Sequence, residues 1–206
     1  MLNRIALALT CLAAPLAAQP AQPTAAVQAP APQDDLVPVA VDTSLGRIVI
    51  ALDRGRAPIT TANFLRYVDA HRLDGETFYR SMKMGDGGLI QGGVRSDARK
   101  LFPKIVDEPS SKTGLKNVAG AISMAKNSPD SAQADFFILL SDTPYFDGRP
   151  DDPNGFSAFG RVTEGMDVVK KIFESPVSAT KGEGVMKGQI LEPAVKIMKA
   201  ARVKSP

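Results

Sequence analysis

The stretch Thr77–Gly93, which reads TFYRSMKMGDGGLIQGG, is the segment from which the fold and the function of this chain are most directly inferred. Its first residues, Thr77–Tyr79, are strand formers, and its glycines predict a loop after them. Two polar groups, Arg80 and Gln91, stand among apolar residues and flexible backbone, where an unpaired charge is costly. Arg80 therefore either pairs with a carboxylate such as Asp86 at the rim of a barrel or serves in a functional site. These residues alone do not decide between the two.

Length and composition predict one globular domain rather than a disordered chain. The sequence has 206 residues, of which 44% are hydrophobic, which is enough to bury a core. Its formal net charge of +3 is spread along the chain without a basic run. We therefore expect no binding to nucleic acid.

The sequence contains a single cysteine, Cys11, and a single histidine, His71. One of each is too few for a four-ligand zinc site or for a disulfide within the chain. His71 lies in a polar context after a predicted helix, so we interpret it as a surface residue, and no convincing nucleophile–base pair supports a hydrolase. No cofactor or metal is expected.

The first residues have the pattern of an export signal. Arg4 precedes the apolar run Ile5–Ala14, and alanines follow up to Ala18, so residues 1–18 are predicted to be a secretory signal peptide. The run is too short to span a bilayer, and we expect no stable membrane insertion after cleavage. Cys11 has a poor context for a lipid anchor and would leave with the signal. We expect a bacterial periplasmic protein, with secretion into the medium as the alternative.

The next segment differs in composition from the rest of the chain. Residues 19–38 are rich in Ala, Gln and Pro without a hydrophobic period, which predicts a disordered tether. The folded domain is expected over residues 39–204. Alternating apolar residues on both sides of a turn predict a β-hairpin over 39–52. The stretch 57–70 has a helical apolar stripe, with Pro58 in the first turn, where its missing N–H is harmless.

The remaining patterns predict mostly strands. Apolar runs predict strands over 120–125, 135–140, 156–162 and 194–203, and a second helix begins with Thr163 as its N-cap. Alternation over 135–140 puts Phe137 and Leu139 on one face and Phe136 and Ile138 on the other. Many short strands with turns between them and only two helices favour a mostly β, antiparallel barrel. An open α/β sheet is disfavoured because strands and helices do not alternate.

Several segments resemble, in the same order, the motifs of the cyclophilin-type peptidyl-prolyl cis-trans isomerases. Phe78–Arg80 followed by Ile90–Gly93 is similar to the F-H-R … Q-G-G signature of this family. Pro58–Phe64 is similar to its P-x-T-x-x-N-F helix, and Gly120–Ala125 to its G-x-I-S-M-A strand. The resemblance extends from Val39 to Val203 and implies a closed eight-stranded antiparallel cyclophilin-like barrel capped by two α-helices.

The resemblance also implies an activity and a site. Such an enzyme accelerates rotation about X-Pro bonds in unfolded or newly exported proteins, so proline-containing polypeptides are the expected partners of a protein that we expect to be a monomer. Arg80 is implied to be the catalytic hydrogen-bond donor, and Gln91 to hold the substrate carbonyl. The implied substrate-binding residues wall the proline ring or pair with the peptide through their backbone: Phe137, Met124, Leu89, Ala125, Lys126, Asn127, Tyr145, Phe146 and Phe156. For each apolar residue, ordinary core packing is the alternative.

The chain departs from the family pattern around this site. Gly88 stands where a pocket Phe is usual, in a segment that is longer than in typical members, and Met82 or Met84 could fill the gap. Asp135 replaces a Gln and adds a carboxylate that could occupy Arg80.

Two further replacements, Tyr145 for Trp and Phe156 for His, keep apolar side chains. The longer segment and Gly88 motivate a second hypothesis, in which the barrel is a chaperone module that holds proline-containing segments with little turnover.

Overall fold

The structure is a computed structural model that describes residues 35–95, 97–149, 151 and 153–203. The predicted signal peptide over residues 1–18, including Cys11, lies outside these residues. Residues 19–34 of the predicted tether lie outside them as well. Both stay predictions. Within the described part, no helix is long and apolar enough to cross a bilayer.

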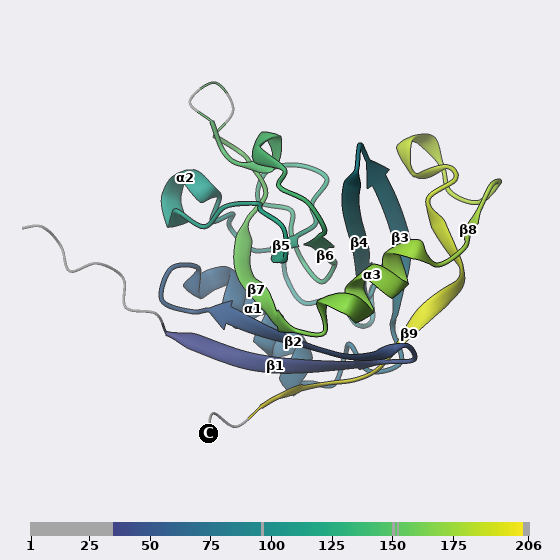
Figure 1. Ribbon diagram of the computed structural model, residues 1–206. Helices are drawn as coiled ribbons and strands as arrows, with labels where there is room; N and C mark the ends of the chain where they lie inside the picture. Colours follow the sequence, from purple (N-terminus) through teal and green to yellow (C-terminus); the bar gives the residue numbers. More distant parts are fainter. Residues whose placement is uncertain (1–34, 96, 150, 152, 204–206) are drawn as a thin grey trace, which may run out of the picture. The chain divides into compact units, whose positions relative to one another are not determined.

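The described strands form one antiparallel sheet, most of which closes into a barrel (Figure 1). The order around the ring is β1-β2-β7-β5-β6-β4-β3-β9, pairing of β1 with β9 closes it, and the short β8 is added at β9. The predicted eight-stranded antiparallel barrel is thus confirmed, with one extra strand. The strands are β1 (Leu36–Thr43), β2 (Gly46–Asp53), β3 (Thr77–Met84), β4 (Gly87–Gly93), β5 (Ala121–Met124), β6 (Phe136–Leu139), β7 (Ala158–Glu164), β8 (Val177–Ser178) and β9 (Ile190–Arg202).

Two helices cover the barrel core, as predicted. The described helices are α1 (Pro58–Asp69), α2 (Ser110–Thr113) and α3 (Met166–Glu174), with 3-10 turns at Pro144–Phe146 and Gly184–Met186. Helix α1 has Pro58 in its first turn and buries Phe64, whose ring lies 5.2 Å from that of Phe136. Helix α3 buries Val169 and Ile172. The one-turn α2 was not predicted.

Some element ends differ from the prediction because strand pairing continues further than the local pattern suggests. Strand β1 begins at Leu36, opposite Asp53, rather than at Val39. Strand β9 begins at Ile190, opposite Arg80, rather than at residue 194. The strand expected over 156–162 is β7, which starts at Ala158 and continues to Glu164.

The N-cap assigned to Thr163 was wrong. Thr163 lies in β7, and its hydroxyl donates to the Val49 carbonyl of β2. Helix α3 begins after Gly165, whose φ of +81° favours glycine and turns the chain from strand into helix.

The glycine-rich loop predicted in the opening stretch is a hairpin. Strand β3 continues to Met84 and β4 starts at Gly87, so that only Gly85 and Asp86 form the turn. The residues expected to form a loop are therefore paired in two strands, up to Met84 opposite Gly87.

The alternation along the strands separates two apolar clusters, one inside the barrel and one on its outer face. On β6, Phe136 and Ile138 belong to the interior cluster, whereas Phe137 and Leu139 belong to the outer one, as predicted from period-two alternation. Leu89 of β4 joins the outer cluster. The candidate site is built on this outer cluster.

Candidate active site

A β-bulge places two consecutive polar residues on the same side of β3. Phe78 pairs with Gly92, but Arg80 pairs with Gln91, so the register shifts by one residue at Tyr79. Regular alternation would send Tyr79 and Arg80 to opposite faces, whereas a bulge re-aims the side chains next to it. Both residues consequently line one cavity on the outer face of the barrel.

The cavity has a volume of about 520 Å³ and combines an apolar wall with a polar one. Its lining comes from strands β3, β4 and β6, from the segments after β4 and β5, from the two 3-10 turns and from the loop before β7. The lining residues are Tyr79, Arg80, Met82, Leu89, Gln91, Arg95, Leu101, Ala125, Lys126, Asn127, Ser131, Gln133, Ala134, Asp135, Phe137, Phe146, Phe156 and Met186.

Most of the residues that the sequence assigns to a site meet here, but two do not. Met124 is 1% exposed and packs in the barrel interior, because its position on β5 points inward. Tyr145 is 57% exposed, and its ring packs edge-on against Phe146 outside the cavity. For these two residues the structure gives a packing role instead of a place in the pocket wall.

Three phenylalanines form the apolar wall. The ring centroid of Phe137 lies 5.6 Å from that of Phe146 and 5.3 Å from that of Phe156, and the last two are 4.7 Å apart. Phe146 comes from the 3-10 turn after β6 and Phe156 from the loop before β7. Leu89 lies in the same cluster. The wall offers an aromatic surface of the kind that accommodates a small apolar ring.

Arg80 is buried at the opposite wall and makes three hydrogen bonds. Its Nε donates to Gln189 Oε1 at 2.8 Å, its Nη1 to Gln91 Oε1 at 2.9 Å, and its Nη2 to Met82 Sδ at 2.9 Å. In the part of the chain that the structure describes, Arg80 forms no ion pair with a carboxylate. Pairing with Asp86 or Asp135, which the sequence left open, is therefore not observed.

Asp135 instead belongs to a hydrogen-bond relay that ends on Arg80. The Tyr79 hydroxyl donates to Asp135 Oδ2 at 2.8 Å and accepts from Gln91 Nε2 at 2.7 Å, and the Arg95 backbone N–H donates to Asp135 Oδ1 at 2.8 Å. An ionised carboxylate only accepts and a guanidinium only donates. The Gln91 amide between them is therefore held with its oxygen toward Arg80 and its nitrogen toward Tyr79.

Burial shifts the pKa values of the groups in this relay. Burial raises the pKa of Asp135, although the hydrogen bonds from Tyr79 and Arg95 oppose this shift. Burial, followed by the negative charge of Asp135, raises the pKa of the Tyr79 hydroxyl, so it stays protonated and can donate. Burial also lowers the pKa of Arg80, but an arginine starts so far above neutral pH that it remains a cation.

Glycine at position 88 is required by the backbone and not by the pocket. Its φ is +150°, and a Cβ there would lie 2.0 Å from the Met82 carbonyl oxygen. A Phe at this position could not be accommodated. Met82, two residues beyond Arg80 on the same face of β3, lines the cavity, and Met84 packs against the outer cluster nearby.

The stretch Ala125–Asn127 lines the cavity, but its lysine side chain is already engaged. Lys126 and Asp107 form an ion pair at 2.5 Å with side chains only 7% and 8% exposed. Lys126 Nζ also donates to the carbonyls of Asn154 at 2.7 Å and of Gly155 at 3.1 Å. The ammonium therefore ties the loop before β7 to the site, and this stretch would contribute backbone groups to a bound peptide.

Several residues of the site were not found from the sequence. Tyr79 was seen only as part of a motif, and Gln189, Arg95 and Met186 lie too far along the chain for a local pattern to connect them with Arg80. The Arg95 guanidinium carbon lies 4.7 Å from the Tyr79 ring centroid. Among the described residues, no group of three or more His, Cys, Asp or Glu side chains is arranged to hold a metal ion.

Comparison with known proteins agrees with the fold and with the geometry of the site. Residues 38–201 match the family model described as cyclophilin type peptidyl-prolyl cis-trans isomerase. A Streptomyces antibioticus peptidyl-prolyl cis-trans isomerase is 36% identical over 147 residues, which are 70% of this chain and 87% of that protein. Peptidyl-prolyl cis-trans isomerase A of Dickeya dadantii is 37% identical over 136 residues, covering 65% of this chain and 70% of the relative.

Solved structures show the same fold. A crystal structure of a Cryptosporidium parvum cyclophilin-type peptidyl-prolyl cis-trans isomerase superposes with a TM-score of 0.66 at 20% identity, over 83% of this chain and 99% of that one. A second structure of that protein, in the presence of the dipeptide Ala-Pro, gives a TM-score of 0.65 at 20% identity, over 82% of this chain and 99% of that one. The barrel, the motifs in order and the matched length lead to one conclusion. This chain belongs to the cyclophilin-type peptidyl-prolyl cis-trans isomerase family.

Proposed function

We propose that this protein is a peptidyl-prolyl cis-trans isomerase and that Arg80 is its catalytic hydrogen-bond donor. One observation carries the proposal: a buried guanidinium, which has no carboxylate partner among the described residues, lies beside an amide in a cavity with an aromatic wall. Such a cation is costly to bury, and an anionic side chain does not compensate it here. A role toward a ligand accounts for its retention.

The reaction requires only a pocket and a donor. Rotation about the X-Pro bond is slow because twisting the C–N bond disrupts resonance, with a barrier of about 18–20 kcal/mol. In the twisted state the prolyl nitrogen becomes pyramidal, and its localised lone pair accepts a hydrogen bond that the planar amide nitrogen barely accepts. A donor at this position binds the transition state better than the ground state, which is the condition for acceleration.

The observed hydrogen bonds leave donors for this purpose. A guanidinium has five N–H groups, and Arg80 uses one at Nε, one at Nη1 and one at Nη2. One N–H on each Nη therefore remains for a substrate. The Gln91 amide gives one of its two N–H groups to Tyr79 and retains the other for the carbonyl of the residue before proline.

The apolar wall would hold the proline ring opposite these donors. Phe137, Phe146 and Phe156 present their rings to the cavity, with Leu89 beside them. An X-Pro segment lying between the two walls would bring its prolyl nitrogen to the guanidinium. Restriction of the peptide to this geometry adds to the effect of the donor.

Exchange spectroscopy by NMR on an Ala-Pro-containing peptide tests the proposal. The wild type should make cis–trans exchange fast on the NMR timescale, and Arg80→Ala should slow it by about 10- to 150-fold, the range for loss of a charged hydrogen bond. Equal exchange rates for both proteins would reject Arg80 as the donor. Peptide binding by the wild type without accelerated exchange would instead favour the chaperone module.

We further propose that the protein acts as a monomer in the bacterial periplasm on unfolded or newly exported chains. The charged start and short apolar run of residues 1–18, followed by the Pro-rich segment 19–38, support this location. Cell fractionation with N-terminal sequencing of the mature protein tests it, and light scattering tests the monomer. Full-length protein in the cytoplasm would contradict the proposed location.

A further inference from the structure

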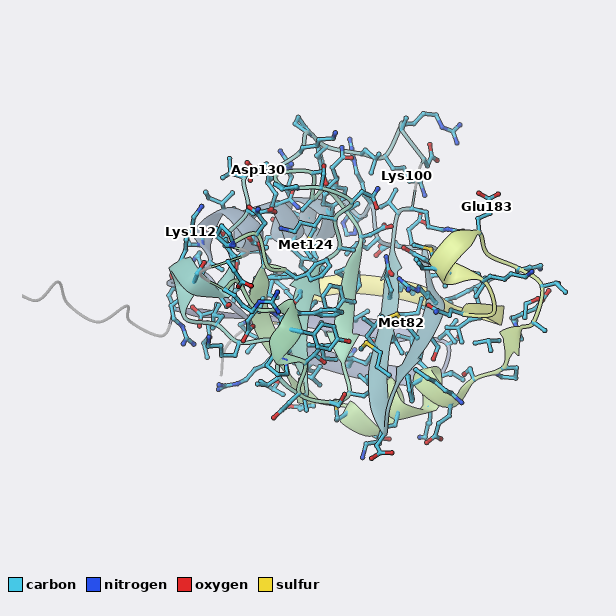
Figure 2. All side chains as sticks on the ribbon, turned by 90° about the horizontal axis from the view of Figure 1, so that it is seen from above. Met82, Lys100, Lys112, Met124, Asp130 and Glu183 are labelled. Atoms are coloured by element: carbon cyan, nitrogen blue, oxygen red, sulfur yellow. The ribbon has the colours of Figure 1, made fainter. Side chains whose placement is uncertain are left out.

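Methionines gather at the mouth of the cavity. Met82 and Met186 line it, and Met84 packs against the outer apolar cluster, where its Sδ accepts the Tyr145 hydroxyl at 2.6 Å. Met124, by contrast, is enclosed in the barrel interior, and Figure 2 shows it apart from Met82. The site thus exposes thioethers to whatever enters the cavity.

Met82 differs from the other methionines because it touches the proposed catalytic group. The two side chains project from the same face of β3, and Arg80 Nη2 donates to Met82 Sδ at 2.9 Å. A thioether is a weak acceptor and holds a guanidinium loosely. Since Arg80 has no carboxylate partner among the described residues, no anion competes for its guanidinium. A stronger acceptor introduced at Met82 would therefore bind Arg80 more tightly than the thioether does.

Oxidation would introduce such an acceptor at this atom. A hydroperoxide transfers one oxygen to Sδ: a sulfur lone pair forms the S–O bond, the O–O bond breaks, and the second oxygen leaves as water or an alcohol. The sulfur loses two electrons and the peroxide gains them. The product, methionine sulfoxide, is polar and accepts hydrogen bonds, and sulfoxide reductases return it to the thioether. Met82 is only partly buried and lines an open cavity, so a small peroxide can reach it.

We propose that Met82 is an oxidation site at which hydroperoxides reversibly inactivate the enzyme, because the sulfoxide oxygen accepts from Arg80 Nη2 and withdraws the guanidinium from the prolyl nitrogen. This inference rests on the proposed isomerase function of Arg80. It assigns the effect to Met82 alone. Met84 accepts from Tyr145, and Met186 is not one of the three described hydrogen-bond partners of Arg80.

The test treats the full chain with graded hydrogen peroxide and follows three quantities on the same samples. Peptide mass spectrometry gives the extent of oxidation at each methionine, and NMR exchange on an Ala-Pro-containing peptide gives activity. The Nη2–H resonance of Arg80 reports its hydrogen bond to the side chain at position 82. Each variant is compared with its own untreated rate. Activity should fall in proportion to oxidation of Met82, by about 10- to 150-fold at completion, the range for loss of a charged hydrogen bond. A sulfoxide reductase should restore it.

Matched variants identify the responsible sulfur. Met82→Leu, which nearly conserves volume, should retain most of its own untreated rate under peroxide. Met186→Leu, in the same cavity, and Met198→Leu, 59% exposed on β9, should lose as much as the wild type. Complete oxidation of Met82 without loss of exchange, or equal loss in Met82→Leu, would overturn the inference.

The Arg80 resonance separates this failure from failure of the proposed function. If the untreated wild type does not accelerate exchange, the isomerase proposal fails, but the resonance still tests the contact. A shift that follows Met82 oxidation and is absent from Met82→Leu supports capture of the guanidinium. An unchanged resonance in fully oxidised protein refutes it.

Discussion

Asp135→Asn is the most informative single change, because it replaces one carboxylate oxygen, which accepts hydrogen bonds, with an NH₂ group, which donates them. The carboxylate accepts from the Tyr79 hydroxyl at 2.8 Å and from the Arg95 backbone N–H at 2.8 Å. In the variant the amide oxygen can satisfy only one of these two positions. If it accepts from Arg95, its N–H₂ group faces the Tyr79 oxygen.

The conflict then affects Gln91 and Arg80, the two groups proposed to act on the substrate. Tyr79 either leaves its O–H without an acceptor or turns it toward Gln91, whose amide must flip and present its N–H₂ to Arg80. Each arrangement leaves one buried donor unsatisfied, at a cost of about 1–3 kcal/mol. If this cost falls on the geometry of Gln91 and Arg80, kcat/KM should fall by about 5- to 150-fold.

Stability should change less than activity. Burial raises the pKa of Asp135, so the folded protein binds this proton more tightly than the unfolded chain. The carboxyl therefore lowers the free energy of unfolding as pH rises from its unfolded pKa, about 3.9, to its higher folded pKa. The neutral amide is free of this penalty, which offsets part of the lost hydrogen bond in urea unfolding at neutral pH.

The pH profile supplies the readout that a purely structural role would leave unchanged. Wild-type activity should fall as pH decreases through the raised pKa of Asp135, since a protonated carboxyl donates to Tyr79 as the amide does. Asp135→Asn should lack this acid limb. The positive charge of Arg95 lowers the pKa of Asp135 and the negative charge of Glu76 raises it. Glu76→Gln therefore serves as the control and should keep the acid limb, moved toward lower pH. An Asp135→Asn enzyme with the wild-type rate and the wild-type acid limb would refute the relay.

Three further substitutions test the architecture that supports the site. Gly88→Ala should destabilise the protein by about 2 kcal/mol or more, because its Cβ would lie 2.0 Å from the Met82 carbonyl oxygen, whereas Gly85→Ala, with nothing within 4 Å, should cost about half as much. Equal shifts in urea midpoint would contradict this reading. Lys126→Met leaves the Asp107 carboxylate buried without its cation and should cost about 3–5 kcal/mol, much of it recovered when Asp107→Asn is added. A single Lys126→Met variant as stable as the wild type would show that the pair has no structural role. Phe136→Ala should lower stability by about 3–5 kcal/mol, while Phe137→Ala should mainly weaken peptide binding, measured by NMR titration. A comparable loss of binding in both would indicate that the wall is not a specific pocket.

The fold could be predicted from the sequence because its signals are local and agree with one another. Alternation on β6 correctly assigned Phe136 to one face and Phe137 to the other, and Pro58 correctly marked the start of α1. The glycines of the β3–β4 hairpin were misleading because Gly88 is required by its positive φ inside a strand, where a loop was expected. Turn composition and strand composition look alike when the strand is glycine-rich.

The site was predictable only in part because its geometry depends on a bulge and on distant contacts. The side-chain period of a strand gives no indication that Tyr79 and Arg80 share a face, and Gln189 reaches Arg80 across 109 positions of sequence. Asp135 was considered as a partner of Arg80, but the bulge places Tyr79 and Gln91 between them. Met124 was assigned to the pocket from the family motif, although β5 turns it inward.

The central claim is that the Arg80 guanidinium binds the twisted X-Pro bond better than the planar one. The most direct test measures peptide affinity and exchange rate together, for the wild type and for Arg80→Ala, by NMR on one Ala-Pro-containing peptide. We predict that Kd changes little while the exchange rate in the bound state falls by about 10- to 150-fold, because the lost hydrogen bond forms mainly in the transition state. Loss of affinity with an unchanged bound-state exchange rate would contradict the claim and leave Arg80 as a binding residue.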